Sequence, residues 1–115
     1  MCPPALSMEE PMDTLTRLEA TIAQRLTASP ETSYVAKLHA KGLAKIAQKL
    51  GEEATETVIA ALAGDEAELV GEAADVIFHL MVLLAEKGVP LGAVLAELDR
   101  REGLSGLAEK ASRTE

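Results

Sequence analysis

The chain has 115 residues, of which 48% are hydrophobic but only 2% are aromatic. That length fits one domain, whose core must be built from aliphatic side chains. The formal net charge of -8 disfavours general nucleic-acid binding, because phosphate backbones are bound by clustered Lys and Arg. A small molecule that carries phosphates is not excluded where a metal cation intervenes.

Cysteine usage and hydropathy point to a cytoplasmic protein that binds no membrane. The only cysteine, Cys2, provides neither a disulfide framework nor a cysteine-based zinc site. The first residues lack the basic segment and apolar block of a signal peptide. The longest apolar run, Val76 to Ala85, contains His79 and is too short to span a bilayer.

The first helix is expected from an N-cap at Asp13 to about Ala28, where Pro30 prevents its continuation. Its apolar residues recur at helical spacing: Leu15, Leu18, Ile22 and Leu26. Residues 1–12 are expected to form a flexible tail.

The next segment, SYVAKLHAKG, is expected to form a short helix that Gly42 interrupts. A long helix should follow from about Leu43 to Ala63, before Gly64 ends it and Asp65 caps the next one. The apolar stripe of this long helix is expected to comprise Leu43, Ile46, Leu50, Ala54, Thr57, Val58 and Ala61.

Two more helices are expected, from about Glu66 to Glu86 and from Pro90 to about Arg101. Residues 103–115 should form a polar tail, which leaves 13–102 as the folded domain. Short connections between helices imply antiparallel neighbours. The predicted fold is therefore all-α, an antiparallel bundle of four to five helices.

Acidic residues border the apolar faces of the two longest predicted helices. At 100° per residue, Glu52 and Glu56 share a narrow sector with Lys45 and Lys49, and Glu53 lies just beside it. On the following helix, one sector holds Glu68, Glu72, Asp75 and His79.

Two pairs of these carboxylates stand at i, i+3: Glu53 with Glu56, and Glu72 with Asp75. Each pair repels itself unless a cation lies between its members. If the two helices pack antiparallel, the pairs converge into an oxygen-only site of the kind that Mg²⁺ or Mn²⁺ prefers. Either pair alone would be read as a solvated surface, but two pairs on consecutive helices favour a metal site.

Basic residues precede the acidic cluster at every fourth position: Lys37, Lys41, Lys45 and Lys49. They form either a solvated ridge with its own salt bridges or a row of ammonium groups for phosphates. Tyr34, just ahead of them, either packs a base or ribose or closes the end of the bundle. His79 is more often a hydrogen-bonded core histidine than a substrate contact, and His39 has no evident carboxylate partner.

A family resemblance covers nearly everything from Leu15 to Arg101. The chain carries Glu53-x-x-Glu56, then fifteen residues, then Glu72-x-x-Asp75. With the surrounding QKLGEEATE and EAADVIFHL, this pattern resembles the phosphoribosyl-ATP pyrophosphatase family, a branch of the MazG-like all-α nucleoside triphosphate pyrophosphohydrolases.

The resemblance implies Mg²⁺-dependent hydrolysis of phosphoribosyl-ATP to phosphoribosyl-AMP and pyrophosphate, the second step of histidine biosynthesis. Water would attack directly, so no covalent nucleophile is expected. The implied metal ligands are Glu53, Glu56, Glu72 and Asp75, with Glu52 as a further catalytic carboxylate. The candidate substrate contacts are Tyr34, Lys41, Lys45, Lys49 and His79.

Two other functions fit the same pattern. A housecleaning pyrophosphohydrolase would use the same metal cluster with another nucleoside pocket, and a non-enzymatic dimeric adaptor would leave the carboxylates solvated. A ferritin-like di-iron site is disfavoured because no Glu-x-x-His pair occurs on either helix. The run VIFHLMVLLA is apolar on more sides than one neighbour can cover, so a homodimer or higher homo-oligomer is expected.

Overall fold

The computed structural model describes the backbone of residues 4–102 and the side chains of residues 14–102. Within this range the chain forms helices and no strand, as predicted for an all-α fold. The five helices are α1 (Pro4–Arg25), α2 (Tyr34–Lys41), α3 (Leu43–Ala63), α4 (Glu66–Lys87) and α5 (Leu91–Glu102). The predicted C-terminal tail, 103–115, lies outside the described residues.

The helix boundaries agree closely with the prediction from α2 onwards, and they differ at α1. That helix begins at Pro4 rather than near Asp13, so Asp13 lies within the helix and is not its N-cap. It also ends at Arg25, before the expected Ala28, because the chain there enters the turn that leads to Pro30. None of the described helices is long and apolar enough to cross a membrane.

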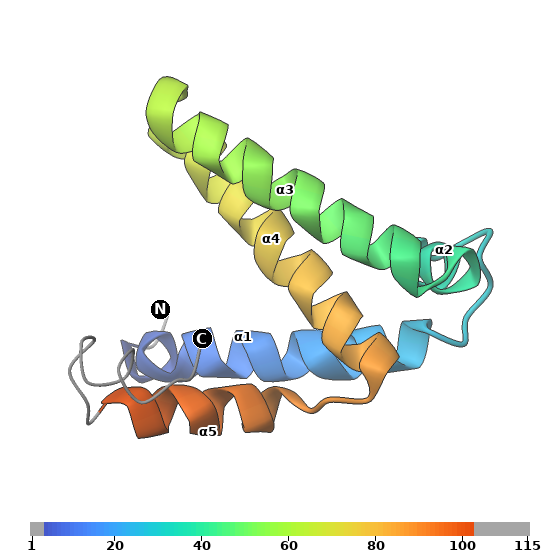
Figure 1. Ribbon diagram of the computed structural model, residues 1–115. Helices are drawn as coiled ribbons and strands as arrows, with labels where there is room; N and C mark the ends of the chain where they lie inside the picture. The colour runs from blue at the N-terminus through green and yellow to red at the C-terminus, as the bar shows by residue number, and fades with distance from the viewer. Residues whose placement is uncertain (1–3, 103–115) are drawn as a thin grey trace, which may run out of the picture.

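Helices α3 and α4 lie side by side as a hairpin. Their contact is the most extensive between any two of the described helices. Figure 1 shows this hairpin rising away from α1 and α5, with α2 at its base. Near that base, the backbone N–H of Leu91 donates to the Glu19 carboxylate at 2.8 Å and so joins the start of α5 to α1. Among residues 4–102, no further helix lies beside the distal end of the hairpin (Figure 1).

The core sits where α1 and α2 meet the base of the hairpin. Its fully buried large side chains come from three helices: Ile22, Ile46 and Val82. Three of the four apolar residues predicted for the first helix are among the partly buried residues that surround this core. The whole surrounding set is Leu15, Leu18, Leu26, Phe78, Leu83, Ala85 and Leu91.

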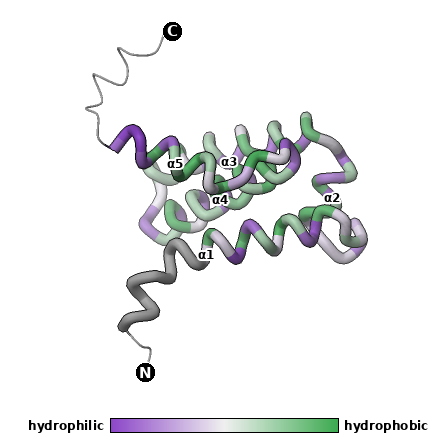
Figure 2. Tube along the Cα trace, turned by 90° about the horizontal axis from the view of Figure 1, so that it is seen from below, coloured by the Kyte–Doolittle hydropathy of each residue, from purple (hydrophilic) through white to green (hydrophobic). Residues whose placement is uncertain are grey.

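Of the predicted apolar stripe of α3, Ile46 is buried, whereas Val58 is 57% exposed and Leu43 is 39% exposed. In the distal half of α3, Ala60 is the one buried residue described. A single neighbouring helix covers only one side of α3 there, so much of the stripe is exposed on the single chain. Figure 2 shows hydrophobic residues continuing along α3 and α4.

Local hydrogen bonds explain where the site-bearing helices begin. The buried Ser33 hydroxyl caps α2 by accepting from Ala36 N at 3.1 Å. Gly42, at φ 102°, takes a left-handed conformation that separates α2 from α3. At the tip of the hairpin, Asp65 accepts from Glu68 N while the Glu68 carboxylate accepts from Asp65 N, which forms a capping box.

Replacing Asp65 tests the contribution of this capping box to the hairpin. Asp65→Ala should lower the free energy of unfolding by about 1 kcal/mol, because an orphan N–H at the start of α4 loses its acceptor. Asp65→Asn is the matched control, since Asn caps about as well as Asp. Urea unfolding followed by circular dichroism measures both, and equal losses in the two variants would contradict the capping role.

Candidate active site

Three of the predicted metal ligands meet between α3 and α4. One carboxylate oxygen from each of Glu53, Glu56 and Glu72 lies within 4.8 Å of the others. Glu53 and Glu56 are a turn apart on α3, and the antiparallel packing brings Glu72 of α4 opposite them. The i, i+3 spacing therefore converges as predicted for three of the four carboxylates.

Glu72 is the most constrained member of this cluster. Its Oε1 atom is buried and has no hydrogen-bond partner among the described residues. Burial, the charge of Glu56 and the contact with Glu53 raise the pKa of the Glu72 carboxyl above 4.5. Glu53 is itself an acceptor when ionised, so this contact is repulsive unless a proton or a cation is shared.

Asp75, the fourth predicted ligand, is exposed on α4 and lies outside the three-carboxylate cluster. Its charge nevertheless contributes to the raised pKa of Glu72, which places it next to the cluster.

Glu52 also lies beside the cluster rather than within it. It accepts a hydrogen bond from Gln48 Nε2 at 2.8 Å, and Lys49 Nζ lies 3.5 Å from its Oε1 atom. The Gln48 hydrogen bond and the two nearby ammonium groups, Lys49 and Lys45, lower the pKa of Glu52 below 4.5. The surroundings of Glu52 and Glu72 thus shift the pKa values of these two carboxyls in opposite directions.

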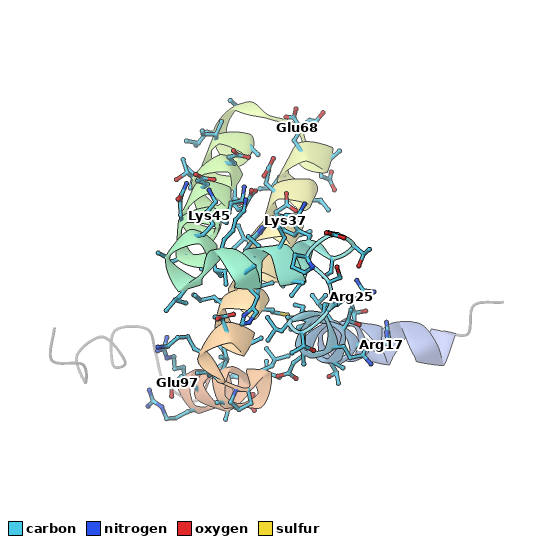
Figure 3. All side chains as sticks on the ribbon, turned by 90° about the vertical axis from the view of Figure 1, so that its right-hand side faces the viewer. Arg17, Arg25, Lys37, Lys45, Glu68 and Glu97 are labelled. Atoms are coloured by element: carbon cyan, nitrogen blue, oxygen red, sulfur yellow. The ribbon has the colours of Figure 1, made fainter. Side chains whose placement is uncertain are left out.

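The predicted lysine row is divided by the break at Gly42. Lys37 and Lys41 are exposed on α2, and Lys45 and Lys49 continue on α3. Lys49 Nζ lies 3.9 Å from Glu53 Oε2, so it borders the three-carboxylate cluster. Figure 3 shows Lys37 of α2 and Lys45 of α3 between α2 and the distal end of the hairpin. Arg17 and Arg25 lie on α1.

Tyr34 and His79 meet at the base of the cluster. The Tyr34 hydroxyl lies 2.9 Å from His79 Nε2, and the rings of Phe78 and Tyr34 stack with centroids 6.0 Å apart. His79 is buried, and its Nδ1 atom lies 2.8 Å from the backbone oxygen of Asp75. His79 is therefore hydrogen-bonded in the interior, while Tyr34 remains 46% exposed.

His39, expected to lack a carboxylate partner, has one. Its Nδ1 atom lies 2.8 Å from Glu86 Oε1, which links α2 to α4. Sequence reasoning missed this pair because 47 positions separate the two residues. The Gln48–Glu52 bond was also missed, although its i, i+4 spacing made it visible.

A groove of about 450 Å³ opens beside the cluster toward the hairpin tip. Glu56, Glu68 and Glu72 line it together with Ile59, Ala60, Ala63 and Gly64. Another hollow, of about 360 Å³, lies between α1 and the end of α4, and Glu19 is its one carboxylate. Glu19 already accepts from Leu91 N, so this second hollow is not a competing metal site.

The three-carboxylate cluster fits a hard divalent cation. Two ligand oxygens of octahedral Mg²⁺ lie about 3 to 4 Å apart, so a spacing of up to 4.8 Å needs only small side-chain rotations. The donors are all carboxylate oxygens, which favours Mg²⁺ or Mn²⁺ over softer metals. A cation would also pair the buried Glu72 oxygen.

Fold and site together define a class: an all-α enzyme whose helical hairpin presents a carboxylate cluster beside basic residues. The family model for phosphoribosyl-ATP pyrophosphohydrolase matches residues 15–102. A protein named phosphoribosyl-ATP pyrophosphatase from Novosphingobium aromaticivorans is 76% identical over 100 residues, which cover 87% of this chain and 94% of that protein. A protein of the same name from Erythrobacter litoralis is 72% identical over 102 residues, 89% of this chain and 98% of that protein.

The chain belongs to the phosphoribosyl-ATP pyrophosphohydrolase family. It is therefore a hydrolase, and the adaptor hypothesis is set aside. The matched residues include all of α2 to α5, and so they contain every predicted site residue.

The raised pKa of Glu72 predicts how stability depends on pH. Between pH 4.5 and that raised pKa, the folded protein binds more protons than the unfolded chain, so stability without metal should fall as pH rises. Glu72→Gln removes this loss. In EDTA the variant should melt above the wild type near neutral pH, and the difference should shrink below about pH 4.

Thermal unfolding with and without Mg²⁺ completes this test. Mg²⁺ should raise the melting temperature of the wild type and have less effect on Glu72→Gln, because a cation bound to the folded state stabilises it. Glu66→Gln, an exposed change at the start of α4, is the matched control. A Glu72→Gln variant less stable than the wild type in EDTA would show that the carboxylate is already satisfied without metal.

Proposed function

We propose that this protein hydrolyses phosphoribosyl-ATP to phosphoribosyl-AMP and pyrophosphate with Mg²⁺, with Mn²⁺ as a possible substitute. This is the second step of histidine biosynthesis. The observation that carries the proposal is the buried, unpartnered Glu72 oxygen within a cluster of three carboxylates. The names of the relatives supply the substrate. A cytoplasmic location remains an expectation from the cysteine usage.

The charge distribution of the site supports a polyanionic substrate that arrives with its cation. A triphosphate would be repelled by the three carboxylates alone, so they need a divalent ion between them and the phosphates. When bound, that ion would polarise the phosphoryl group and lower the pKa of a water ligand. Glu53, Glu56 and Glu72, whose oxygens lie within 4.8 Å of one another, would hold it, and Asp75 stands one turn after Glu72.

The chain's own side chains divide the remaining work. Lys45 and Lys49 lie beside the acids, and no ion pair forms at Lys45 within the described part of the chain. Lys45 is thus available to a phosphate, and Lys41 on α2 is exposed for the same purpose. To Glu52, whose carboxylate Gln48 and Lys49 keep ionised, we assign the role of orienting the attacking water.

The bond broken is a P–O bond of the oxygen bridge between the α and β phosphates of the substrate. Water adds to one of these phosphorus atoms, and the other phosphate group leaves with the bridging oxygen, giving phosphoribosyl-AMP and pyrophosphate. The proton released by the water passes to a carboxylate at the edge of the cluster. No covalent intermediate with the protein is required.

Pyrophosphate release from phosphoribosyl-ATP tests this proposal directly. The wild type should release pyrophosphate with Mg²⁺ and none in EDTA. Glu56→Gln and Glu72→Gln should each lower kcat/KM at least about a hundredfold, since even groups that only orient metal ligands cost tenfold to a hundredfold. Asp75→Asn should cost less, because Asp75 lies outside the cluster. Glu66→Gln should retain activity.

The same assay separates the proposed substrate from those of the housecleaning alternative. The wild type should prefer phosphoribosyl-ATP to dCTP and dUTP. Pyrophosphate release from those nucleotides but not from phosphoribosyl-ATP would assign the protein to housecleaning. No Mg²⁺-dependent release from any of them would contradict both functions.

The exposed apolar surface of the hairpin supports a homodimer. Large apolar side chains are exposed along the distal halves of both helices, including Ile59 at 57%, Leu62 at 83% and Val70 at 62%. Such a continuous exposed face is unusual for a monomer and is typical of a surface that another chain covers. A second copy offers the same apolar face, which is the arrangement of a two-fold interface.

Charge substitutions on the hairpin test the homodimer. Val58→Glu and Val70→Glu should shift the wild-type dimer toward monomer in sedimentation velocity, because each would bury an unpaired charge in the interface. Leu98→Glu on α5 is the matched control, since Leu98 is 55% exposed but lies off the hairpin. A wild type that sediments as a stable monomer at micromolar concentration would refute the dimer.

A further inference from the structure

The Tyr34–His79 pair has a defined direction of hydrogen bonding. His79 Nδ1 faces the backbone oxygen of Asp75 at 2.8 Å. A carbonyl oxygen only accepts, so the hydrogen of the neutral imidazole must sit on Nδ1. Nε2 is then an acceptor, and the Tyr34 hydroxyl at 2.9 Å must donate its single hydrogen to it.

This direction leaves the Tyr34 oxygen able only to accept. Its one hydrogen is used within the protein, and Tyr34 is 46% exposed, so its side chain is open to a substrate. His79, by contrast, is 5% exposed, so water does not compete for its ring nitrogens. The stacked Phe78 ring, with centroids 6.0 Å from Tyr34, limits the phenol's freedom to turn away.

Two sets of contacts connect Tyr34 with the edge of the carboxylate cluster. His79 stands one turn after Asp75 and binds its backbone. On the other side, Tyr34 begins α2, which packs against α3, and on α3 Lys49 Nζ lies 3.9 Å from Glu53 Oε2. A substrate whose phosphates reach the metal and Lys49 would pass close to the Tyr34 oxygen.

We propose that Tyr34 is a specificity-determining residue that accepts a hydrogen bond from a ribose hydroxyl of the substrate, and that His79 is the positioning residue that imposes this polarity. The proposal rests on the proposed function. The triphosphate chain offers ionised oxygens that only accept, so it gains nothing from an acceptor at Tyr34. The riboses carry hydroxyl donors. Tyr34 and the lysines thereby bind chemically different parts of one nucleotide.

Nitrogen-15 NMR of the histidines tests the polarity without any substrate. His79 should be a neutral ring with its hydrogen on Nδ1. The chain has two histidines, so a His39→Gln variant assigns the signals. A hydrogen on Nε2, or a doubly protonated ring at neutral pH, would overturn the proposal, because the Tyr34 hydroxyl would then be free to donate.

Steady-state kinetics test the contact with the ribose. Tyr34→Phe keeps the ring and removes the oxygen, so KM for phosphoribosyl-ATP should rise about fivefold to tenfold with kcat nearly unchanged, as for one lost neutral hydrogen bond. Substrates that lack single ribose hydroxyls identify the partner. For one of them, the wild type and Tyr34→Phe should have equal KM values.

The role of His79 predicts a non-additive pair of variants. His79→Leu removes the acceptor that orients the phenol, so it should also reduce the preference for the hydroxyl-bearing substrate. Adding Tyr34→Phe to His79→Leu should then change KM no further, whereas independent roles would multiply. A melting temperature measured for each variant separates this effect from a loss of fold.

The outcomes distinguish failure of this inference from failure of the proposed function. An active wild type with an unchanged KM in Tyr34→Phe, or a penalty that persists with every deoxy substrate, would overturn the ribose contact alone. A wild type that releases no pyrophosphate from phosphoribosyl-ATP would overturn the proposed function and the ribose contact with it.

Discussion

Repulsion among three carboxylates is the constraint on which the rest of the structure depends. Glu53, Glu56 and Glu72 offer oxygens within 4.8 Å of one another, and one Glu72 oxygen is buried without a partner. An arrangement of this kind is unfavourable for the folded chain alone. The extended contact between α3 and α4, the capping box at their junction and the core at their base hold it in place. The carboxylates are thereby positioned for a cation before one binds.

The pKa values of Glu72, within the cluster, and of Glu52, beside it, are shifted in opposite directions. Gln48 and Lys49 hold Glu52 in the ionised form, whereas burial and neighbouring acids act against the ionised form of Glu72. The lysines meet the cluster from the base of the hairpin, and the open groove lies toward its tip. A nucleotide bound at this site would thus meet cationic, metal-binding and neutral hydrogen-bonding groups along its length.

Helical periodicity predicted most of the fold, since α3 has its predicted bounds and α4 and α5 differ by about one residue. Spacing also brought Glu53, Glu56 and Glu72 together, because antiparallel packing follows from the short Gly64–Asp65 connection. Helical periodicity did not predict contacts between residues that are far apart in the sequence. The His39–Glu86 and Tyr34–His79 pairs depend on how α2 crosses the hairpin, which no local pattern encodes. The pattern located the apolar stripe of α3, but periodicity does not tell which chain covers an apolar face, so the exposure of Val58 could not be predicted from it.

Anomalous diffraction from crystals soaked in Mn²⁺ tests the central claim most directly. The account predicts a manganese peak between α3 and α4, within bonding distance of oxygens from Glu53, Glu56 and Glu72. The peak should disappear in crystals of Glu56→Gln grown and soaked in the same way. Carboxylates that stay apart with no ion among them, even with a bound nucleotide analogue, would contradict it.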